Sequence, residues 1–250
     1  MYKKLFKDFK YLFTYNLSTL IIFELFHKGI AVLAIVPFIN LLINLAIKKE
    51  GLAYLFSQNL IKLITNPISI ILILTAVILL VFYIFFEITA VVICIEEGRK
   101  DNKINFFKLI LLSFKKALLV LNPKNILLFI MILIIIPLTN LNFTSGLLMK
   151  LKIPEYVLHY INSNKLLNII YISVFLLIYI LMNRWIFSIY QVILETTSFN
   201  LAIRKSLKAT KKKLIKIILY SIILFVTTYL VGITVYYIGI VFIALFSKYI

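Results

Sequence analysis

PISIILILTAVILLVFYIFFEITAVVICIEEGRK, residues 67–100, decides the fold of this chain. From Pro67 to Ile95 the only charged side chain is Glu87, and a run of charged residues follows at once. A helix needs about 20 apolar residues to cross a hydrocarbon core of about 30 Å, and each charge near its centre is costly. The stretch therefore predicts a membrane-spanning helix that ends at a charged loop.

Further apolar segments predict an all-α, polytopic integral membrane helix bundle, with residues 1–250 forming a single membrane domain. The other four crossings are expected at Leu17–Ile47, Ile126–Phe143, Leu166–Glu195 and Leu214–Phe246. Pro37 is expected to kink the first crossing, because proline removes a helix hydrogen bond. The last is longer than one straight crossing requires, so Gly232 or Gly239 is expected to mark a kink or a turn into a sixth, short transmembrane segment.

The charge pattern predicts the orientation of the bundle. The chain holds 27 Lys and Arg against nine Asp and Glu, although 63% of its residues are hydrophobic. Nineteen of the basic residues fall in Lys3–Lys10, Arg99–Lys124 and Arg184–Lys216, whereas six fall in the intervening outer loops. Because cytoplasmic loops keep the excess of Lys and Arg, we expect a multi-pass plasma-membrane protein with a cytoplasmic N-terminus. The basic residues flank membrane-length runs, which argues against a nucleic-acid partner and for anionic lipids.

Two inner segments, Ile104–Leu121 and Ser198–Ile217, are predicted to be basic amphipathic helices that lie in the membrane interface. A solvated charge run is the alternative, but it does not account for their apolar faces. The residues expected to contact lipid headgroups are Lys108, Lys115, Lys116, Arg204, Lys205, Lys208, Lys211 and Lys212.

The same two segments match each other at a constant offset. Asn105-Phe106 and Ser113-Phe114-Lys115 correspond to Ser198-Phe199 and Ser206-Leu207-Lys208. Each segment follows one long apolar run and precedes another. The sequence therefore predicts an internal repeat of crossing, elbow helix and crossing, about residues 67–143 and 166–246.

Two ionisable residues are the main site candidates, because a charge inside a membrane helix is a functional hypothesis by default. Glu87 and Arg184 each lie about 20 residues into a helix that enters from outside, so an intramembrane ion pair is expected. Snorkelling to the headgroups and a ligand or ion site are the alternatives. Glu24 and Lys28 are spaced for a local helix pair. The single cysteine and two histidines predict no catalytic, metal or cofactor site, and no cofactor is expected.

One set of residues carries a family resemblance. It comprises LLMKLKIPEYVLHYI at Leu147–Ile161, Glu87, NRWIF at Asn183–Phe187, Leu194-Glu195 and Ser198-Phe199. These segments resemble the membrane domain that precedes the catalytic domain of some bacterial glycerophosphodiester phosphodiesterases. The resemblance implies a domain that anchors or guides lipid-headgroup hydrolysis, with a separate glycerophosphodiesterase domain or other membrane subunits as partners.

The resemblance does not extend to the family's hydrolase. That enzyme uses a His-Arg-Gly motif with acidic metal ligands, and neither His27 nor His159 is followed by Arg-Gly. We therefore expect no enzymatic activity. An apolar run stops at Ile250, so a truncated or split gene is one expectation. A transporter-like or permease-like bundle, or a structural partner of other membrane subunits, is the alternative function.

Overall fold

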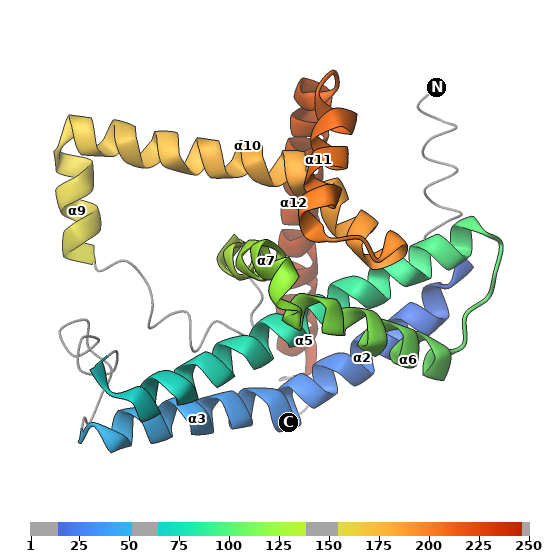
Figure 1. The fold of residues 1–250 in the computed structure, drawn as a ribbon, viewed down its shortest axis with the longest axis horizontal. Helices are drawn as coiled ribbons and strands as arrows, with labels where there is room; N and C mark the ends of the chain where they lie inside the picture. Colours follow the sequence, from blue (N-terminus) through green and yellow to red (C-terminus); the bar gives the residue numbers. More distant parts are fainter. Residues whose placement is uncertain (1–14, 52–64, 139–154, 247–250) are drawn as a thin grey trace. The chain divides into compact units, whose positions relative to one another are not determined.

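The computed structural model describes residues 15–51, 65–138 and 155–246, and every regular element in these ranges is helical (Figure 1). Two compact units are formed, Met1–Leu158 with Ile189–Ala202, and His159–Ser188 with Ile203–Ile250. The elements are α2 (Leu17–Ile30), η1 (Ala31–Ile35), α3 (Val36–Lys49), α5 (Pro67–Arg99), α6 (Phe106–Ala117), η3 (Leu118–Leu121), η4 (Pro123–Asn125), α7 (Ile126–Leu138), α9 (Glu155–Ser163), α10 (Lys165–Glu195), α11 (Phe199–Thr210) and α12 (Leu214–Phe246).

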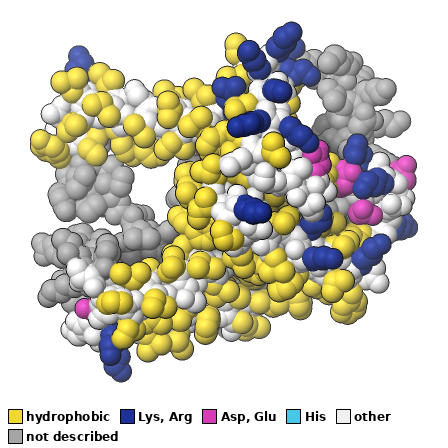
Figure 2. All heavy atoms as spheres, viewed as in Figure 1, with side chains coloured by type: hydrophobic (Ala, Val, Ile, Leu, Met, Phe, Trp, Pro, Cys, Tyr) yellow, Lys and Arg dark blue, Asp and Glu magenta, His cyan; other side chains and the backbone are white. Residues whose placement is uncertain are grey.

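Three of the expected crossings are confirmed as helices that are long and apolar enough to span a membrane. Within the described ranges these are Leu17–Lys49, Pro67–Arg99 and Lys165–Glu195. Figure 2 shows hydrophobic side chains over much of the visible face, including the length of α10, whereas Lys and Arg gather around α11. Such an apolar exterior is what a bilayer requires of helices that cross it.

The third expected crossing differs from the prediction, which placed a separate span at Ile126–Phe143. The chain from Phe106 to Leu121 and the helix from Pro123 to Ile134 are long and apolar enough to span a membrane only when taken together, and they meet at a bend of 79°. Asn122 makes the bend, because its side-chain oxygen accepts from the Lys124 N–H at 3.0 Å while Pro123 has no N–H to continue a helix. The pair is thus a broken span or a re-entrant loop, and residues 139–143 lie outside the described ranges.

Two glycines do not interrupt α12. The helix runs from Leu214 to Phe246 through both Gly232 and Gly239. A turn into a sixth segment at either glycine is therefore wrong, because glycine weakens a helix without removing its hydrogen bonds.

The first long helix carries its irregularity just before Pro37. The segment η1, Ala31–Ile35, is a π-helical turn between α2 and α3. Pro37 donates no hydrogen bond to the carbonyl of Leu33, and a π turn is one of the ways in which a helix absorbs such a gap. The proline therefore widens the helix locally and does not end it.

The core of the first unit lies between α3 and α5. Ile39 and Leu42 pack with Ala76, and all three are buried. Ser69, at the same interface, donates from its hydroxyl to the Ala46 carbonyl at 3.3 Å and to a Glu50 carboxylate oxygen at 2.9 Å. Small residues such as Ala76 and Ser69 let membrane helices approach closely, and a serine hydroxyl can bond across the contact.

Both elbow segments form twelve-residue helices, α6 and α11, and both bury a face with the same spacing. The matching buried positions are Leu109, Ser113 and Ala117 in α6, and Ala202, Ser206 and Thr210 in α11, where Phe199 is buried as well. The second elbow was expected to continue as one helix to Ile217, but α11 ends at Thr210 and residues 211–213 form a turn before α12. Lys211 and Lys212 therefore belong to this turn and not to the helical face.

The second unit is joined by side-chain hydrogen bonds between its own helices. The Tyr179 hydroxyl of α10 and the Ser221 hydroxyl of α12 lie 2.6 Å apart. The Ser206 hydroxyl donates to the main-chain carbonyl of Arg184. The short helix α9 begins at Glu155, where the helix dipole favours an acidic side chain.

Candidate functional site at the end of α5

A buried carboxylate, Glu96, lies at the centre of a polar cluster in the last turn of α5. Glu96 is 4% exposed, and it accepts hydrogen bonds from Arg99 Nε at 2.9 Å and Arg99 Nη2 at 2.7 Å. Lys100 Nζ lies 3.4 Å from the same carboxylate. The Tyr190 hydroxyl of α10 donates to its second oxygen. A buried charge is costly unless it is paired in this way, so the cluster ties α10 to the end of α5.

Local sequence explains why the end of α5 and its C-cap residue, Lys100, contribute three of these groups. Arg99 and Lys100 follow Glu96 by three and four residues, which places all three on one side of the helix. The cations also suit a helix C-terminus, where the dipole favours positive charge. Asp101 then adopts a left-handed backbone with φ of 57°, and Asn102 N–H donates to the Glu97 carbonyl at 2.9 Å. The chain thus turns away directly after the cluster.

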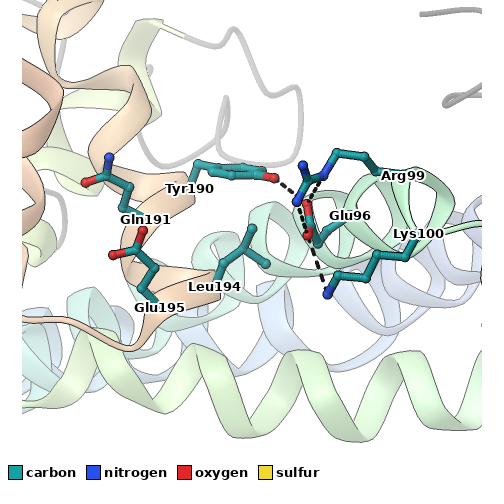
Figure 3. A pocket seen from close by; sticks show the side chains of 7 residues that line it. All are labelled: Glu96, Arg99, Lys100, Tyr190, Gln191, Leu194 and Glu195. Atoms are coloured by element: carbon teal, nitrogen blue, oxygen red, sulfur yellow. Dashed lines mark hydrogen bonds and ion pairs between the residues drawn. The ribbon is translucent and has the colours of Figure 1, made fainter. Parts of the chain in front are cut away.

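A cavity of about 310 Å³ opens beside the cluster, with groups of different character at its two ends (Figure 3). Glu96, Arg99 and Lys100 form one end, whereas Gln191 and Glu195 of α10 lie together at the other. The remaining lining residues are Tyr190 and Leu194.

A second cavity of about 170 Å³ adjoins the first, since both are lined by Glu96, Lys100 and Leu194. Apolar side chains make up half of its lining, and Lys116 of α6 adds a second cation beside Lys100. The residues specific to this cavity are Ile93, Glu97, Leu112, Lys116 and Ile193. The two cavities together form a mixed polar and apolar recess at the C-terminal ends of α5 and α10.

Asn16, at the start of the first long helix, holds the turn that follows the cluster. Its amide donates to the carbonyl of Asn102 at 3.1 Å and approaches that of Cys94 at 3.4 Å. Its side-chain oxygen accepts from Ile104 N–H at 3.1 Å. The hydroxyl of Thr19 donates to the Ile104 carbonyl at 3.0 Å. The connection between α5 and α6 is thereby fixed from the N-terminal helix.

Asn125 has the equivalent role at the other wall of the recess. Its side-chain oxygen accepts from the Phe199 N–H at 3.0 Å, and its amide donates to the Leu119 carbonyl at 2.9 Å. Because Phe199 begins α11 only four residues after Glu195, this contact fixes where the chain leaves α10. Both walls are therefore held by a buried asparagine from another part of the first unit.

The predicted ion pair of Glu87 with Arg184 joins residues of different units and stays a prediction. Within the first unit, Glu87 lies near Glu24 and Lys28. The predicted local pair is confirmed, since Lys28 Nζ lies 3.5 Å from Glu24 Oε2. On the next face, the His27 ring stacks on Tyr83 at a centroid distance of 4.0 Å. Polar groups thus gather between α2 and α5 inside the predicted membrane layer.

The residues predicted to contact headgroups are exposed with one exception, Lys116, which is half-buried and lines the smaller cavity. Their contact with lipid stays a prediction.

Tyr190, Gln191 and the pairing of Glu96 were not anticipated from the sequence. The charged run after Ile95 was the available signal for Glu96 and Arg99, but Tyr190 lies 94 residues away in an apolar run and gives no local signal. Among the described residues, no group of three or more His, Cys, Asp or Glu could hold a metal ion.

Comparison with known proteins places the chain in a family. No curated protein and no solved structure matches it. A family model for the membrane domain of glycerophosphoryl diester phosphodiesterase matches residues 2–250. This match agrees with the long apolar helices and with the resemblance carried by the sequence. The chain therefore belongs to the family of membrane domains of glycerophosphoryl diester phosphodiesterase.

Proposed function

We propose that this chain is a plasma-membrane domain that anchors or guides lipid-headgroup hydrolysis at the cytoplasmic surface, while a separate hydrolase supplies the chemistry. The family match over residues 2–250 carries the proposal. The excess of Lys and Arg in residues 3–10, 99–124 and 184–216 supports an orientation with the N-terminus and both elbow helices in the cytoplasm. The elbow helices would then lie at the cytoplasmic membrane surface, where a hydrolase could reach the lipid headgroups.

The three faces of α6 support an interfacial position. Leu109 and Ala117 are buried against the rest of the unit, whereas Phe107 and Leu111 are 76% and 71% exposed. At about 100° per residue, Lys108 and Lys115 lie beside this exposed apolar face. A helix in the headgroup layer needs this arrangement, with apolar groups directed to acyl chains and lysines to anionic phosphates.

The repeat of crossing, elbow and crossing remains part of the proposal, and the matching buried positions of α6 and α11 support it. Two elbows of the same construction would give the domain two lipid-facing surfaces, either of which could position a hydrolase.

Reconstitution tests this function. Proteoliposomes that contain the chain should not release glycerol 3-phosphate from glycerophosphocholine with divalent metal ions. After addition of a purified glycerophosphodiesterase catalytic domain, they should retain more of that domain on sedimentation than empty liposomes do. Replacement of Lys108 and Lys115 by Gln should reduce this retention if the basic elbow recruits the domain. Equal retention by empty liposomes, or metal-dependent release by the chain alone, would contradict the proposal.

A transporter-like function is the second candidate, and the polar residues between α2 and α5 favour it. Glu24, Lys28 and Glu87 lie close together within helices that are long enough to cross the membrane. Ionisable groups in such a place commonly serve ion or substrate pathways. Uptake of radiolabelled glycerophosphocholine into the proteoliposomes, abolished by Glu87→Gln, would favour transport over anchoring.

A further inference from the structure

We propose that the polar cluster between α2 and α5 binds one exchangeable proton, which the carboxyl groups of Glu24 and Glu87 share inside the membrane. The cluster comprises Glu24, His27 and Lys28 of α2 with Tyr83 and Glu87 of α5, all within the first unit. This inference goes beyond the proposed function, because the proton is held whether the domain anchors a hydrolase or moves a substrate.

Reciprocal contacts fix how α2 lies along α5 in the first unit (Figure 1). His27 Nε2 lies 3.4 Å from the Tyr83 carbonyl oxygen, and the Tyr83 hydroxyl donates to the His27 carbonyl. Earlier in α2, the Phe23 ring meets the Phe86 ring of α5 edge to face, with centroids 5.4 Å apart. Because a step back along α2 matches a step forward along α5, the two helices run antiparallel here.

This register brings the two carboxyl groups of the cluster together. Glu24 precedes His27 by three residues, and Glu87 follows Tyr83 by four. Each therefore lies about one helical turn from the reciprocal contact, on the same face and in the same direction. Lys28 Nζ lies 3.5 Å from Glu24 Oε2, whereas Glu87 makes no ion pair of its own with any described residue.

The depth of Glu87 places the cluster inside the hydrocarbon layer. Helix α5 has 33 residues, about 50 Å at about 1.5 Å each, so about 10 Å extends beyond each side of a core of about 30 Å. Glu87 precedes Arg99 by twelve residues, which is about 18 Å from that end of the helix. Water is scarce at this depth, and an unbalanced charge is costly there.

The charges of the cluster do not balance without a proton. If both carboxyl groups are ionised, Glu24 and Glu87 contribute two negative charges and Lys28 contributes one positive charge. Two carboxylates at one site also repel each other, so that one of them retains a proton. A proton on the pair removes the excess charge and lets one carboxyl group donate to the other.

His27 does not supply the missing positive charge, because its ring is stacked between other rings. Its centroid lies 4.0 Å from that of Tyr83 and 5.6 Å from that of Phe23, and the side chain is buried. Such apolar surroundings favour a neutral imidazole.

The neighbouring elements add no charge to the cluster. Helix α6 contacts this part of α2 and α5 through the uncharged rings of Phe106 and Phe114. Of the α6 lysines, Lys108 and Lys115 are exposed, and Lys116 lines the cavity at Glu96. The π turn η1 contains no titratable side chain. A metal ion is not favoured in place of the proton, since the described residues provide no group of three or more His, Cys, Asp or Glu around one.

Carbodiimide labelling of the purified full-length chain in detergent tests the assignment. Dicyclohexylcarbodiimide is an apolar reagent that adds as a whole molecule to a protonated carboxyl group, and peptide mass spectrometry locates the adduct. At about pH 8, far above the pKa of about 4.3 of an ordinary glutamate, we expect an adduct at Glu24 or Glu87. No adduct at either residue would mean that another cation balances both carboxylates, which would overturn the proposal. Protection by sodium chloride but not by choline chloride would show that a metal ion occupies the site, which would also overturn it.

Substitutions distinguish a shared proton from two independent ones. In Glu87→Gln the Glu24–Lys28 pair is neutral, and in Glu24→Gln the ammonium of Lys28 is left for Glu87. Labelling of the remaining carboxyl group should therefore fall by about tenfold or more, because the like charge that retains the proton is gone. Labelling of Glu87 that persists in Glu24→Gln would overturn the shared proton.

Two further variants control for charge and for folding. Glu97→Gln makes the same charge change in α5 outside the cluster and should leave the labelling unchanged. Lys28→Gln removes the positive charge of the cluster and should increase the labelling, a change opposite in sign to those of the glutamate variants. Decreased labelling in Lys28→Gln would overturn the charge balance on which the proposal rests.

Discussion

Asn16→Ala should destabilise the first unit by more than the loss of one hydrogen bond would. The substitution leaves the N–H of Ile104, a residue only 3% exposed, without its acceptor at 3.1 Å. A buried unsatisfied donor costs about 1–3 kcal/mol, and the lost bond to the Asn102 carbonyl adds about 1 kcal/mol. We therefore expect the free energy of unfolding to fall by about 2–4 kcal/mol.

Thr19→Val provides a matched control in the same helix. It removes one hydroxyl bond, to the Ile104 carbonyl, at nearly constant volume, and should cost about 1 kcal/mol. Unfolding in detergent can be followed with a thiol-reactive fluorophore, because Cys94 is the chain's one cysteine and is 3% exposed. Far-UV circular dichroism should be recorded in parallel to separate global unfolding from local opening near Cys94. If Asn16→Ala loses no more stability than Thr19→Val, the proposed role of Asn16 is wrong.

Three further predictions concern topology, coupling and activity. In a cysteine-free background, a cysteine at Ser163 should react with an impermeant thiol reagent outside intact cells and one at Lys212 should not; the reverse pattern would invert the orientation. If Glu87 pairs with Arg184, the losses of unfolding free energy of the two single alanine variants in detergent should not add up to the loss of the double variant. Additive losses for this pair, together with non-additive losses for Glu87 and Glu24, would mean that the intramembrane ion pair does not form. The purified chain should release no glycerol 3-phosphate from glycerophosphodiesters, and activity that follows this chain through purification would show that it is an enzyme.

Hydrophobic length was sufficient to predict the long helices. The stretch Pro67–Ile95 was expected as a crossing, and α5 extends it only to Arg99. Helix α10 agrees equally well with the expected Leu166–Glu195. Apolar length determines a membrane helix almost independently of tertiary contacts, because the backbone must satisfy its own hydrogen bonds in lipid.

Positions that depend on contacts between distant residues were not predictable in the same way. The break at Asn122 and Pro123 divides an apolar region whose composition alone indicated an independent crossing. The cluster at Glu96 needs Tyr190 from another helix, and the turn before α6 needs Asn16, which lies 88 residues from Ile104. Spacing within one helix could suggest the Glu96–Arg99 pair, but no periodic pattern reports partners on other helices.

The left-handed residues that follow α5 and α10 have a consequence for how the recess could be altered. Asp101 and Thr196 have φ values of 57° and 53°, a backbone region that costs an L-residue roughly 1 kcal/mol or more and is least favourable for β-branched side chains. Each directly follows a cavity-lining residue, Lys100 or Glu195. Glycine would adopt the same turns without this cost, but it would also give the unfolded chain more freedom. Glycine at either turn would therefore relieve strain and at the same time loosen the border of the recess, so the stability of the fold and the shape of the recess depend on the same two residues.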